Sequence, residues 1–414
     1  MCDVLIVGGG PTGLFLGGLL AQQGVDVVVL EQRVEPSAHS RAIGLHPPAL
    51  AALQLLALDE AALARGVRVT AGVVRSRGRG LGRLTFERAW PETPFVLTLP
   101  QNDTEQLLAR RLEELAPGSV QRGWEITEVH HDGGTVEATT ARSGAPGAGA
   151  DVGGATPVTW RARVMVGADG ARSRVRASAG IATDARLYPD AYLMGDFTDT
   201  TGDSSTAVIH LEPDGVVESF PLPQGVRRWV AHTGEAVVEP SPEELAAIVA
   251  TRTGEVVDPA LNTMISAFTV RRQLARRMVT GRQVLIGDAA HEISPIGGQG
   301  MTLGWLDALA LAPLLADVLA PHDGRPLHTL ARFREFERVR LHAARRAARQ
   351  AELNMAVGRP LPLPAAWARE TLVHGLLRTP VRRQLAAAFT MQWAWAGTDD
   401  AEQHQPDRER QLPS

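Results

Sequence analysis

Three glycines near the start of the chain have the spacing of a dinucleotide-binding turn. Gly8, Gly10 and Gly13 form G-x-G-x-x-G between an apolar run and a helical pattern. Such glycines allow a sharp turn and close approach of the backbone to a pyrophosphate, which the N–H groups of the helix N-terminus bind. Glu31, at the end of the next apolar run, can accept hydrogen bonds from a ribose hydroxyl, and Arg41 is either a phosphate ligand or a solvated loop residue. The pattern favours FAD or NAD over NADP and does not choose between the first two.

Two later motifs place an acid among small residues directly after an apolar strand. In GADGARS (167–173), Asp169 could hold a ligand at the carboxyl edge of a sheet, although aspartates are common in ordinary turns. In GDAAHEISPIGGQG (287–300), Asp288 takes the same position and a glycine-rich loop follows. His291 in this segment could be taken for a base or a ligand, but a histidine that packs or hydrogen-bonds behind the loop is the more common case.

The remaining pattern indicates which elements must position these motifs. Residues 67–99 alternate with many turn residues and predict short strands. Residues 187–268 predict an antiparallel sheet, with an appended helix over 241–254 that Ser241 caps. Asp103 or Thr104 is expected to cap a helix that follows Gln101. Further helices are expected over 301–319, where Pro313 would introduce a kink, over 330–357, with a solvated arginine face, and within 367–397.

Composition indicates a soluble enzyme of ordinary type. The chain has 414 residues, 44% hydrophobic and 21% charged, and its formal charge of −4 gives no attraction to nucleic acid or to a bilayer. Cys2 is the only cysteine, which excludes an intramolecular disulfide and a thiolate metal cluster. There is no lysine, so no Schiff-base chemistry on lysine is possible. With a first strand near residue 3 and no apolar run of membrane-spanning length, we expect a cytoplasmic protein without a signal peptide.

The three motifs, in this order, resemble those of the FAD-dependent aromatic hydroxylases, the single-component flavoprotein monooxygenases of the para-hydroxybenzoate hydroxylase type. The likeness extends over about residues 1–320 and looks closest to hydroxylases of aromatic or polyketide natural products. It implies an α/β fold (α+β overall) with a Rossmann-like FAD-binding domain of mixed sheet, an inserted antiparallel-sheet substrate domain and a helical C-terminal region. The expected boundaries are 1–70, 100–180 and 275–325 for the first, 71–99 and 181–274 for the second, 326–397 for the helices, and 398–414 for a disordered tail.

The resemblance also implies roles for single residues. Glu31 would bind the adenosine ribose, Arg41 would lie near the pyrophosphate, Gln101 near the ribityl chain or flavin, and Asp288 would hydrogen-bond the ribityl chain. Asp169 lies in a motif that serves both FAD and the reducing nicotinamide. The expected set of cofactor-binding residues is Gly8, Gly10, Pro11, Thr12, Gly13, Glu31, Gln32, Arg33, Arg41, Gln101, Asp169, Gly287, Asp288, Pro295, Gly298, Gly300 and Met301.

The loop around Pro295, Gly297 and Gly298 would line the reactive face of the flavin, and no side-chain acid or base is assigned. In the implied reaction, NADPH or NADH reduces tightly but non-covalently bound FAD. O2 then forms a flavin C4a-hydroperoxide, which transfers oxygen to an electron-rich aromatic ring. The family often has asparagine where Thr302 stands, and the thioredoxin-like C-terminal domain of many polyketide hydroxylases is expected to be absent. Substrate candidates from the predicted sheet, about half of which strand alternation turns away from the pocket, are Tyr192, His210, Phe220, Trp229, His232 and Phe268.

Other functions remain open on the same pattern. A halogenase is disfavoured because that class uses a catalytic lysine and a W-x-W-x-I-P motif, and WAWAG (393–397) is not that motif. A Baeyer–Villiger or epoxidising flavin monooxygenase on the same scaffold, and a flavin protein that binds a small molecule without turnover, are the alternatives that the sequence does not exclude. No metal site, nucleic-acid partner or membrane partner is expected. The identity of the substrate and the oligomeric state are left undetermined by the sequence.

Overall fold

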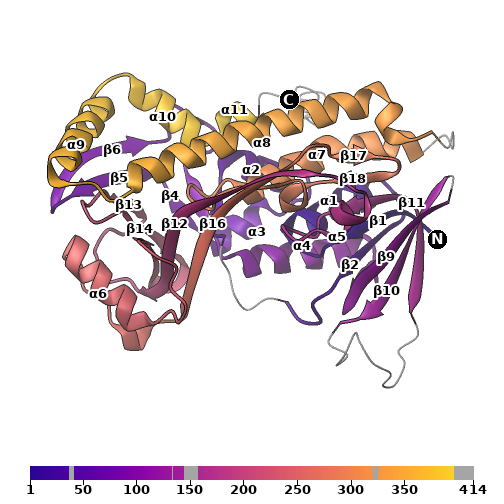
Figure 1. Cartoon of the computed structure of the whole chain (residues 1–414), viewed down its shortest axis with the longest axis horizontal. Helices are drawn as coiled ribbons and strands as arrows, with labels where there is room; N and C mark the ends of the chain where they lie inside the picture. The colour runs from indigo at the N-terminus through magenta and orange to yellow at the C-terminus, as the bar shows by residue number, and fades with distance from the viewer. Residues whose placement is uncertain (37–41, 133, 144–156, 320–324, 396–414) are drawn as a thin grey trace, which may run out of the picture.

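The computed structural model describes residues 1–36, 42–132, 134–143, 157–319 and 325–395. Two eight-stranded sheets lie side by side, and the long helix α8 (Ala331–Gly358) runs over both of them (Figure 1). The predictions for Arg41, for most of the loop 143–157 and for the tail 398–414 concern residues outside the described ranges.

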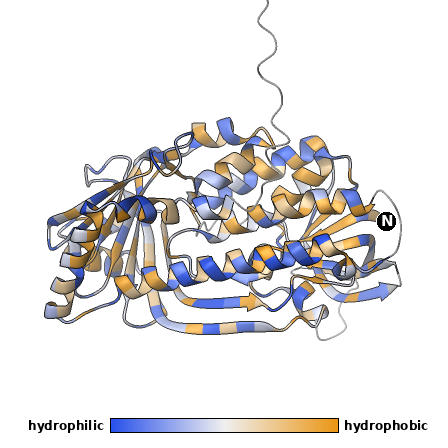
Figure 2. Ribbon diagram, turned by 90° about the horizontal axis from the view of Figure 1, so that it is seen from above, coloured by the Kyte–Doolittle hydropathy of each residue, from blue (hydrophilic) through white to orange (hydrophobic). Residues whose placement is uncertain are grey.

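The first sheet is built on a parallel core. Strands β17, β18, β11, β1, β2 and β8 lie in this order, and β9 and β10 extend the sheet from β11 by antiparallel pairing. Fully buried valine, leucine and isoleucine fill β1, as expected for a strand that is covered on both faces. Figure 2 shows hydrophobic residues along these central strands. Their bounds are β1 Cys2–Val7, β2 Val27–Glu31, β8 Val120–Arg122, β9 Trp124–Asp132, β10 Thr135–Arg142, β11 Val158–Gly167, β17 Val279–Thr280 and β18 Gln283–Leu285.

The second sheet has the order β19-β16-β12-β15-β14-β13-β5-β6. All its pairings are antiparallel except one: β13 and β5 run parallel, so the predicted purely antiparallel sheet needs this correction. Helix α6 (Pro242–Thr253) packs against one face, and Ser241 caps it as predicted, accepting a hydrogen bond from the Glu244 N–H (3.1 Å). The strands are β5 Ala71–Ser76, β6 Arg79–Thr85, β12 Thr183–Thr198, β13 Thr206–His210, β14 Val217–Leu222, β15 Val226–Thr233, β16 Met264–Ala275 and β19 His291–Glu292.

The other elements connect or cover these sheets. A separate sheet has three strands in the order β3-β7-β4. It comprises β3 Gly44–Leu45, β4 Val67–Val69 and β7 Val96–Thr98. The helices are α1 Pro11–Gln22, α2 Pro47–Gln54, α3 Asp59–Arg65, α4 Gln101–Leu115, α5 Arg174–Ser178, α7 Gly300–Leu319, α9 Leu363–Arg378, α10 Val381–Phe389 and α11 Gln392–Trp395, with 3-10 turns at Pro223–Gly225, Pro259–Leu261, Gly287–Ala289 and Leu327–Thr329.

Two helix predictions change in detail, and so does the expectation that no apolar run reaches membrane-spanning length. The helix expected after Gln101 begins at that residue, and neither Asp103 nor Thr104 caps it. The predicted long helix over 330–357 is confirmed as α8, but Arg340 in its arginine run is 2% exposed rather than solvated. Helix α7 is long and apolar enough to cross a bilayer by composition, yet 67% of its apolar window is buried inside the protein. In this structure α7 is therefore a core helix.

Candidate functional site

The three sequence motifs meet at one edge of the first sheet. Strand β11 pairs in parallel with both β1 and β18, and the register aligns Val7 with Gly167 and Gly167 with Leu285. Because the carboxyl ends of parallel strands lie at the same edge, the turns that follow these three strands are neighbours. Residues separated by almost 300 positions in the sequence thus form one site.

The glycines of the first turn differ in what surrounds them. A Cβ on Gly8 (φ +110°) would lie 2.3 Å from the Ala168 carbonyl oxygen, and a Cβ on Gly13 would lie 1.9 Å from the Gly8 carbonyl oxygen. Gly10 has no neighbouring atom within 4 Å of its Cβ position, and no side chain caps α1, which it precedes. Gly8 and Gly13 therefore serve packing, and Gly10 leaves the N-terminus of α1 open to a ligand.

Glu31 has a structural task besides its predicted contact with ribose. It is 4% exposed, and its Oε2 accepts a hydrogen bond from the Gly9 N–H (2.8 Å). Its Oε1 accepts from the N–H and Nε of Arg33, at 2.8 and 3.0 Å. Burial alone would raise the pKa of Glu31, but the Arg33 hydrogen bonds and charge outweigh it and lower the pKa. The carboxylate therefore fixes the glycine turn, and a ribose hydroxyl at Oε2 would replace the long hydrogen bond that Arg33 Nη2 donates to this oxygen (3.4 Å).

Asp169 is bound mainly to its own turn. Its Oδ1 accepts a hydrogen bond from the Ser173 hydroxyl (2.5 Å), and its Oδ2 accepts from the N–H groups of Arg174 and Val175 (2.7 and 3.2 Å). Arg176 then donates to the Ala289 carbonyl oxygen (2.8 Å) and so ties this turn to the third motif. This arrangement matches the turn-aspartate alternative, with the carboxylate shaping the site by holding the start of α5.

The third motif presents an acid to the site. The Asp288 side chain is accessible, yet protein surrounds it on its other sides, and this desolvation raises its pKa to about 6. Gly287 has φ +59°, and a Cβ there would lie 3.0 Å from Thr12 Oγ1. A Cβ on Gly304 would lie 2.4 Å from the same Thr12 oxygen. Thr12 thus packs α1 against α7 rather than facing open space.

A buried charged cluster lies behind this loop. His291 Nε2 lies 2.5 Å from Asp307 Oδ2, which also accepts a hydrogen bond from the Gly287 N–H (2.9 Å). Arg340 Nε donates to Asp307 Oδ1 (2.6 Å). Burial opposes both charged forms, but the mutual attraction outweighs it, raising the pKa of His291 and lowering that of Asp307. His291 is therefore a hydrogen-bonded core histidine, as the more common case predicted, and Asp307 and Arg340 are site-supporting residues that sequence reasoning missed.

His46 is a second missed residue. Its Nε2 donates to the Gly297 carbonyl oxygen (3.1 Å), and its ring meets Phe389 edge-on with centroids 5.5 Å apart. Complete burial lowers the pKa of His46 to about 4, so the ring is neutral near pH 7. The segment GLHPP (44–48) therefore anchors the loop that carries Gly297 and Gly298. The signal in the sequence was a lone histidine before a helix that starts with two prolines.

The substrate candidates divide between the two faces of the second sheet. Tyr192 and Met194 belong to an apolar cluster that includes Ile296 of the glycine-rich loop and Met355 of α8, and Phe220 and Phe268 pack against it. Trp229 lies in the cluster beneath α6, on the opposite face, and the His210 ring contacts it with centroids 6.2 Å apart. Strand alternation thus turns Trp229 and His210 away from the loop and keeps the others beside it.

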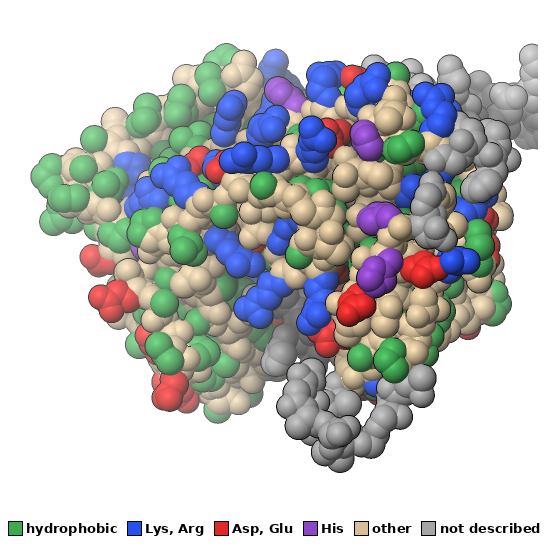
Figure 3. All heavy atoms as spheres, turned by 45° about the vertical axis from the view of Figure 1, so that its right-hand side comes forward, with side chains coloured by type: hydrophobic (Ala, Val, Ile, Leu, Met, Phe, Trp, Pro, Cys, Tyr) green, Lys and Arg blue, Asp and Glu red, His purple; other side chains and the backbone are tan. Residues whose placement is uncertain are grey.

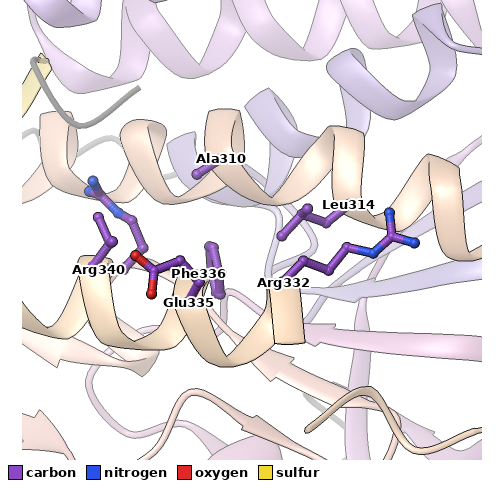
Figure 4. A pocket seen from close by; sticks show the side chains of 7 residues that line it. Ala310, Leu314, Arg332, Glu335, Phe336 and Arg340 are labelled. Atoms are coloured by element: carbon purple, nitrogen blue, oxygen red, sulfur yellow. The ribbon is translucent and has the colours of Figure 1, made fainter. Parts of the chain in front are cut away.

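The structure brings the remaining predicted residues together only in part. Gln101 Nε2 donates to Glu105 Oε1 (2.8 Å), and its N–H donates to the Ala42 carbonyl oxygen (3.1 Å), next to the segment that carries Arg41. Gln32 and Pro295 are exposed. A hollow of about 130 Å³ between α7 and α8, lined among others by Ala310, Leu314 and Phe336, lies beside these helices rather than at the motif-bearing sheet edge (Figure 4).

These residues fit a bound FAD. Gly10 leaves the uncapped end of α1 open, where a pyrophosphate would find N–H groups. Asp288 offers an accessible carboxyl group, and a Cβ at Gly300 would lie 3.9 Å from its Oδ1, at the start of α7. A helix N-terminus for the pyrophosphate, an acid for a ribose and a second acid further along the sheet edge are the groups that an extended dinucleotide needs.

Comparison with known proteins gives a family and a shared fold. The family model described as "FAD binding domain" matches residues 1–350. The chain is 35% identical over 331 residues to 6-methylpretetramide 4-monooxygenase of Streptomyces rimosus, covering 77% of this chain and 56% of that protein. It is 34% identical to rifampicin monooxygenase of Streptomyces venezuelae, covering 76% of this chain and 64% of that protein. The chain therefore spans between half and two thirds of the length of these relatives.

Solved structures show the same architecture over most of the chain. The anhydrotetracycline hydroxylase of Streptomyces rimosus is 26% identical with a TM-score of 0.74, covering 94% of this chain and 76% of that chain. Aklavinone-11 hydroxylase, solved with FAD and aklavinone, is 25% identical with a TM-score of 0.69, covering 87% and 69%. The p-nitrophenol 4-monooxygenase of Pseudomonas putida shares the fold, with a TM-score of 0.80 at 22% identity, covering 95% and 97%.

Proposed function

Because the chain belongs to the FAD-binding-domain family, we propose that it is an FAD-dependent monooxygenase that uses O2 and NAD(P)H to hydroxylate an aromatic, polycyclic or polyketide-type small molecule. The observation that carries this proposal is the position of Ile296. This residue belongs to the third dinucleotide motif and packs in one cluster with Tyr192 and Met194 of the second sheet. A flavin held by the motifs would therefore face an apolar, aromatic surface.

The chain's own residues would hold the cofactor along the motif-bearing edge. The N-terminus of α1 would bind the pyrophosphate, Glu31 the adenosine ribose, and Asp288 the ribityl chain. When bound, the flavin supplies hydride acceptance from a nicotinamide and the activation of O2. The loop at Pro295, Gly297 and Gly298 would exclude water from its reactive face, with His46 holding the loop. The N-terminus of α7 favours negative charge and would stabilise the anionic reduced form.

The names of the relatives support the substrate class. 6-Methylpretetramide and rifampicin are the compounds named for the two relatives at 35% and 34% identity, and aklavinone is bound in a solved neighbour. The aromatic residues Tyr192, Phe220 and Phe268 beside the loop suit a flat ring system of this kind. NADPH or NADH would act as a transient reductant.

The test begins with the absorption spectrum of the purified protein, before and after reconstitution with FAD. The second measurement is NAD(P)H oxidation with and without polycyclic phenols, with mass spectrometry for a product heavier by one oxygen. We expect a flavin spectrum, ligand-stimulated oxidation and a hydroxylated product. A protein that takes up no FAD contradicts the proposal. Ligand binding without turnover would instead support a binding protein, and an inserted ring oxygen or an epoxide would support the other two oxygenation chemistries.

A further inference from the structure

The sheet face that contacts the glycine-rich loop carries one carboxylate in an otherwise uncharged row. The strand pairing aligns one row of residues across six neighbouring strands, from β5 to β16: Val74, Ile209, Glu218, Val230, Met194 and Ser266. Residues directly opposite one another in a sheet point to the same face. Glu218 therefore shares the face of Val230 and Met194, and both of these belong to the cluster that includes Ile296.

The charged groups around Glu218 are engaged elsewhere. In the adjacent row, Arg228 donates two hydrogen bonds of 2.7 Å to Asp196. On the other side, Asp190 is paired with Arg359 of the segment after α8 and with His232. From α9, Arg369 donates to backbone carbonyl oxygens, Glu370 accepts from Ser76 and Arg77, and His374 bonds the Leu81 carbonyl oxygen. Within the described residues, the side chain of Glu218 has no hydrogen bond or ion pair of its own.

This environment leaves Glu218 ready to exchange a proton. Its side chain keeps partial access to solvent but is closely surrounded by protein, and this desolvation raises its pKa to about 7. An ordinary glutamate, with a pKa near 4.3, would be a much weaker base toward a phenol. A general base is most effective when its pKa lies near the working pH.

Tyr192 lies on the same sheet face as Glu218, two strands away from it and displaced along the strand by one inward-facing position. Its hydroxyl group is unused. It is 1% exposed, and its oxygen has no hydrogen-bond partner among the described residues. Its ring stacks on Phe268 (centroids 5.4 Å apart) and meets His232 edge-on (5.2 Å). Burial first, and then the charge of Glu218, raise the pKa of Tyr192, so it stays a neutral hydroxyl. A buried hydroxyl without a partner is costly unless a ligand satisfies it.

We propose that Glu218 binds a phenolic hydroxyl of the substrate and accepts its proton, and that the Tyr192 hydroxyl donates a hydrogen bond to the resulting phenolate oxygen. This inference rests on the proposed function. The substrate O–H bond breaks, its electron pair stays on the oxygen, and the proton forms the carboxylic acid of Glu218. The phenolate pushes electron density to its ortho and para carbons, one of which would bond to an oxygen atom that derives from O2 and two electrons of NAD(P)H. The O–O bond breaks, and the other oxygen atom leaves as water. The hydroxylated ring regains aromaticity by losing its ring proton, and Glu218 returns its own proton to solvent when product leaves.

The first test measures binding to the FAD-loaded protein through the change in flavin fluorescence. The ligands are 2-naphthol and 2-methoxynaphthalene, which differ in the exchangeable proton. We expect wild type to prefer 2-naphthol by about tenfold, the worth of one hydrogen bond to a charged group. Glu218→Gln should remove most of this preference, and Tyr192→Phe should weaken 2-naphthol binding by about threefold to tenfold. Glu239→Gln, an exposed residue outside the site, is the matched control. A preference unchanged in Glu218→Gln overturns the inference.

The second test is the pH dependence of product formation in a single turnover. In wild type the rate should rise as pH increases through about 7, where Glu218 becomes a carboxylate. In Glu218→Gln it should fall by about 10²- to 10⁴-fold near neutrality and recover only toward the pKa of the phenol itself. A variant with wild-type pH dependence contradicts the role, even if the enzyme hydroxylates. Conversely, a Glu218-dependent preference without any product would leave the inference standing and refute the proposed oxygenation. Flavin content and circular dichroism show that each variant folds.

Discussion

At the scale of single residues, two buried histidines near the loop that would face the flavin have pKa values shifted in opposite directions. His46 donates a hydrogen bond to Gly297 and stays neutral, because complete burial lowers its pKa to about 4. His291 is equally buried, yet the carboxylate of Asp307 at 2.5 Å raises its pKa. Asp307 also binds the Gly287 N–H, so the charge of this cluster acts directly on the backbone of the third motif.

We predict that Asp307→Asn lowers the free energy of unfolding by about 3–5 kcal/mol, because Arg340 loses its buried counter-charge. Urea unfolding of wild type and variant at several pH values measures this free energy. The Asp307 pKa is lowered, so its contribution is present above the ordinary aspartate pKa and is lost as pH falls through the folded value. The His291 pKa is raised, so its contribution is present below the ordinary histidine pKa and is lost as pH rises through the folded value. The difference between wild type and variant should therefore be largest in mildly acidic solution.

Asp317→Asn is the control for this prediction, since Asp317 lies in the same helix and pairs with Arg332 at the exposed surface. We expect that loss to stay below about 1 kcal/mol. Equal effects of the two substitutions would show that burial of the cluster has no energetic weight.

A second prediction at this scale concerns Glu31. Glu31→Gln keeps the size of the side chain but removes the charge that binds Gly9 and Arg33. We expect the dissociation constant for FAD to rise about tenfold or more, since hydrogen bonds to a charged group contribute about 1.5–3 kcal/mol. Fluorescence titration of the apoprotein with FAD measures this constant. Glu35→Gln, four residues further along at an exposed position, should leave it unchanged, and equal constants for both variants would contradict the role of Glu31.

At the scale of elements, the contact between α1 and α7 determines where the first and third motifs lie relative to one another. Trp305 stacks on Phe15 with ring centroids 5.1 Å apart and donates from Nε1 to the Pro11 carbonyl oxygen (3.1 Å). Gly304 lets the two helices approach, because its Cβ position is 2.4 Å from Thr12 Oγ1. The same helix carries Asp307, so its displacement would disturb both the glycine turn and the charged cluster.

Gly304→Ala tests this packing. We expect a loss of about 1–3 kcal/mol of stability from overpacking, together with weaker FAD binding, because α7 must move away from α1. The control is Gly375→Ala in α9, where a Cβ would meet nothing within 4 Å. That change should be neutral or stabilise by about 0.5–1 kcal/mol, since alanine is the better helix former. Thermal unfolding followed by circular dichroism and flavin fluorescence separates the two. A neutral Gly304→Ala would mean that the helices are not closely packed there.

Elements with local signals could be predicted from the sequence, and contacts between distant elements could not. The unit around Gly8 and Glu31, the Ser241 cap and the long helix α8 all follow from periodicity and capping within a few residues. The pairing of Asp307 with Arg340 spans 33 residues and depends on how α7 meets α8. One clue was available, since Asp307 and Asp317 are the two acids of a strongly apolar helix, and Asp307 lies in its middle. For Arg340 the sequence offered no such clue, because nothing distinguishes it from the other arginines of the same run.

The site shows the same division. The position of each motif after a strand could be predicted from the sequence and is confirmed, whereas their assignment to one cofactor came from the family resemblance. The sheet face on which each substrate candidate lies could not be predicted. Alternation gives the relative orientation of side chains within a strand, but it does not tell which side of the sheet the loop approaches. Trp229 and His210 were thus selected together with Tyr192, although they lie on the α6 face. Glu218 was overlooked because a single acid in a strand ordinarily faces water.

At the scale of the whole molecule, α8 connects the two sheets (Figure 1). Its middle packs Ala343, Ala344 and Ala347 against Leu303 and Leu306 of α7, in a cluster that also includes Leu274 of β16. Near its end, Met355 joins the cluster of the second sheet. Figure 3 shows arginine side chains gathered along the upper part of the molecule, where α8 lies in Figure 1. The helix therefore has an apolar underside that spans both units and a basic outer side.

Two ion pairs tie the end of α8 to the second sheet: Glu352 pairs with Arg186 of β12, and Arg359, directly after the helix, pairs with Asp190. Arg359 donates hydrogen bonds of 2.9 and 2.7 Å to the two carboxylate oxygens of Asp190, which also lies 3.3 Å from His232. The Arg359 hydrogen bonds lower the pKa of Asp190 although burial opposes this. The contribution of this ion pair to the stability of the fold is therefore fully present above the ordinary aspartate pKa. It is lost as the pH falls through the lowered pKa that Asp190 has in the folded protein.

We predict that Arg359→Gln loosens this clamp and exposes the substrate face without disturbing the dinucleotide motifs. The loss of stability should be about 1–2 kcal/mol, since the Arg359 side chain is 39% exposed and solvent screens part of the interaction. Hydrogen exchange followed by mass spectrometry should show faster exchange at the end of α8 and in β15, and unchanged exchange in β1 and α1. Arg338→Gln, at an exposed pair with Glu335, should change neither region. Uniformly faster exchange would mean that α8 joins the two sheets into one cooperative unit, whereas exchange confined to the end of α8 would mean that Arg359 does not hold the sheet.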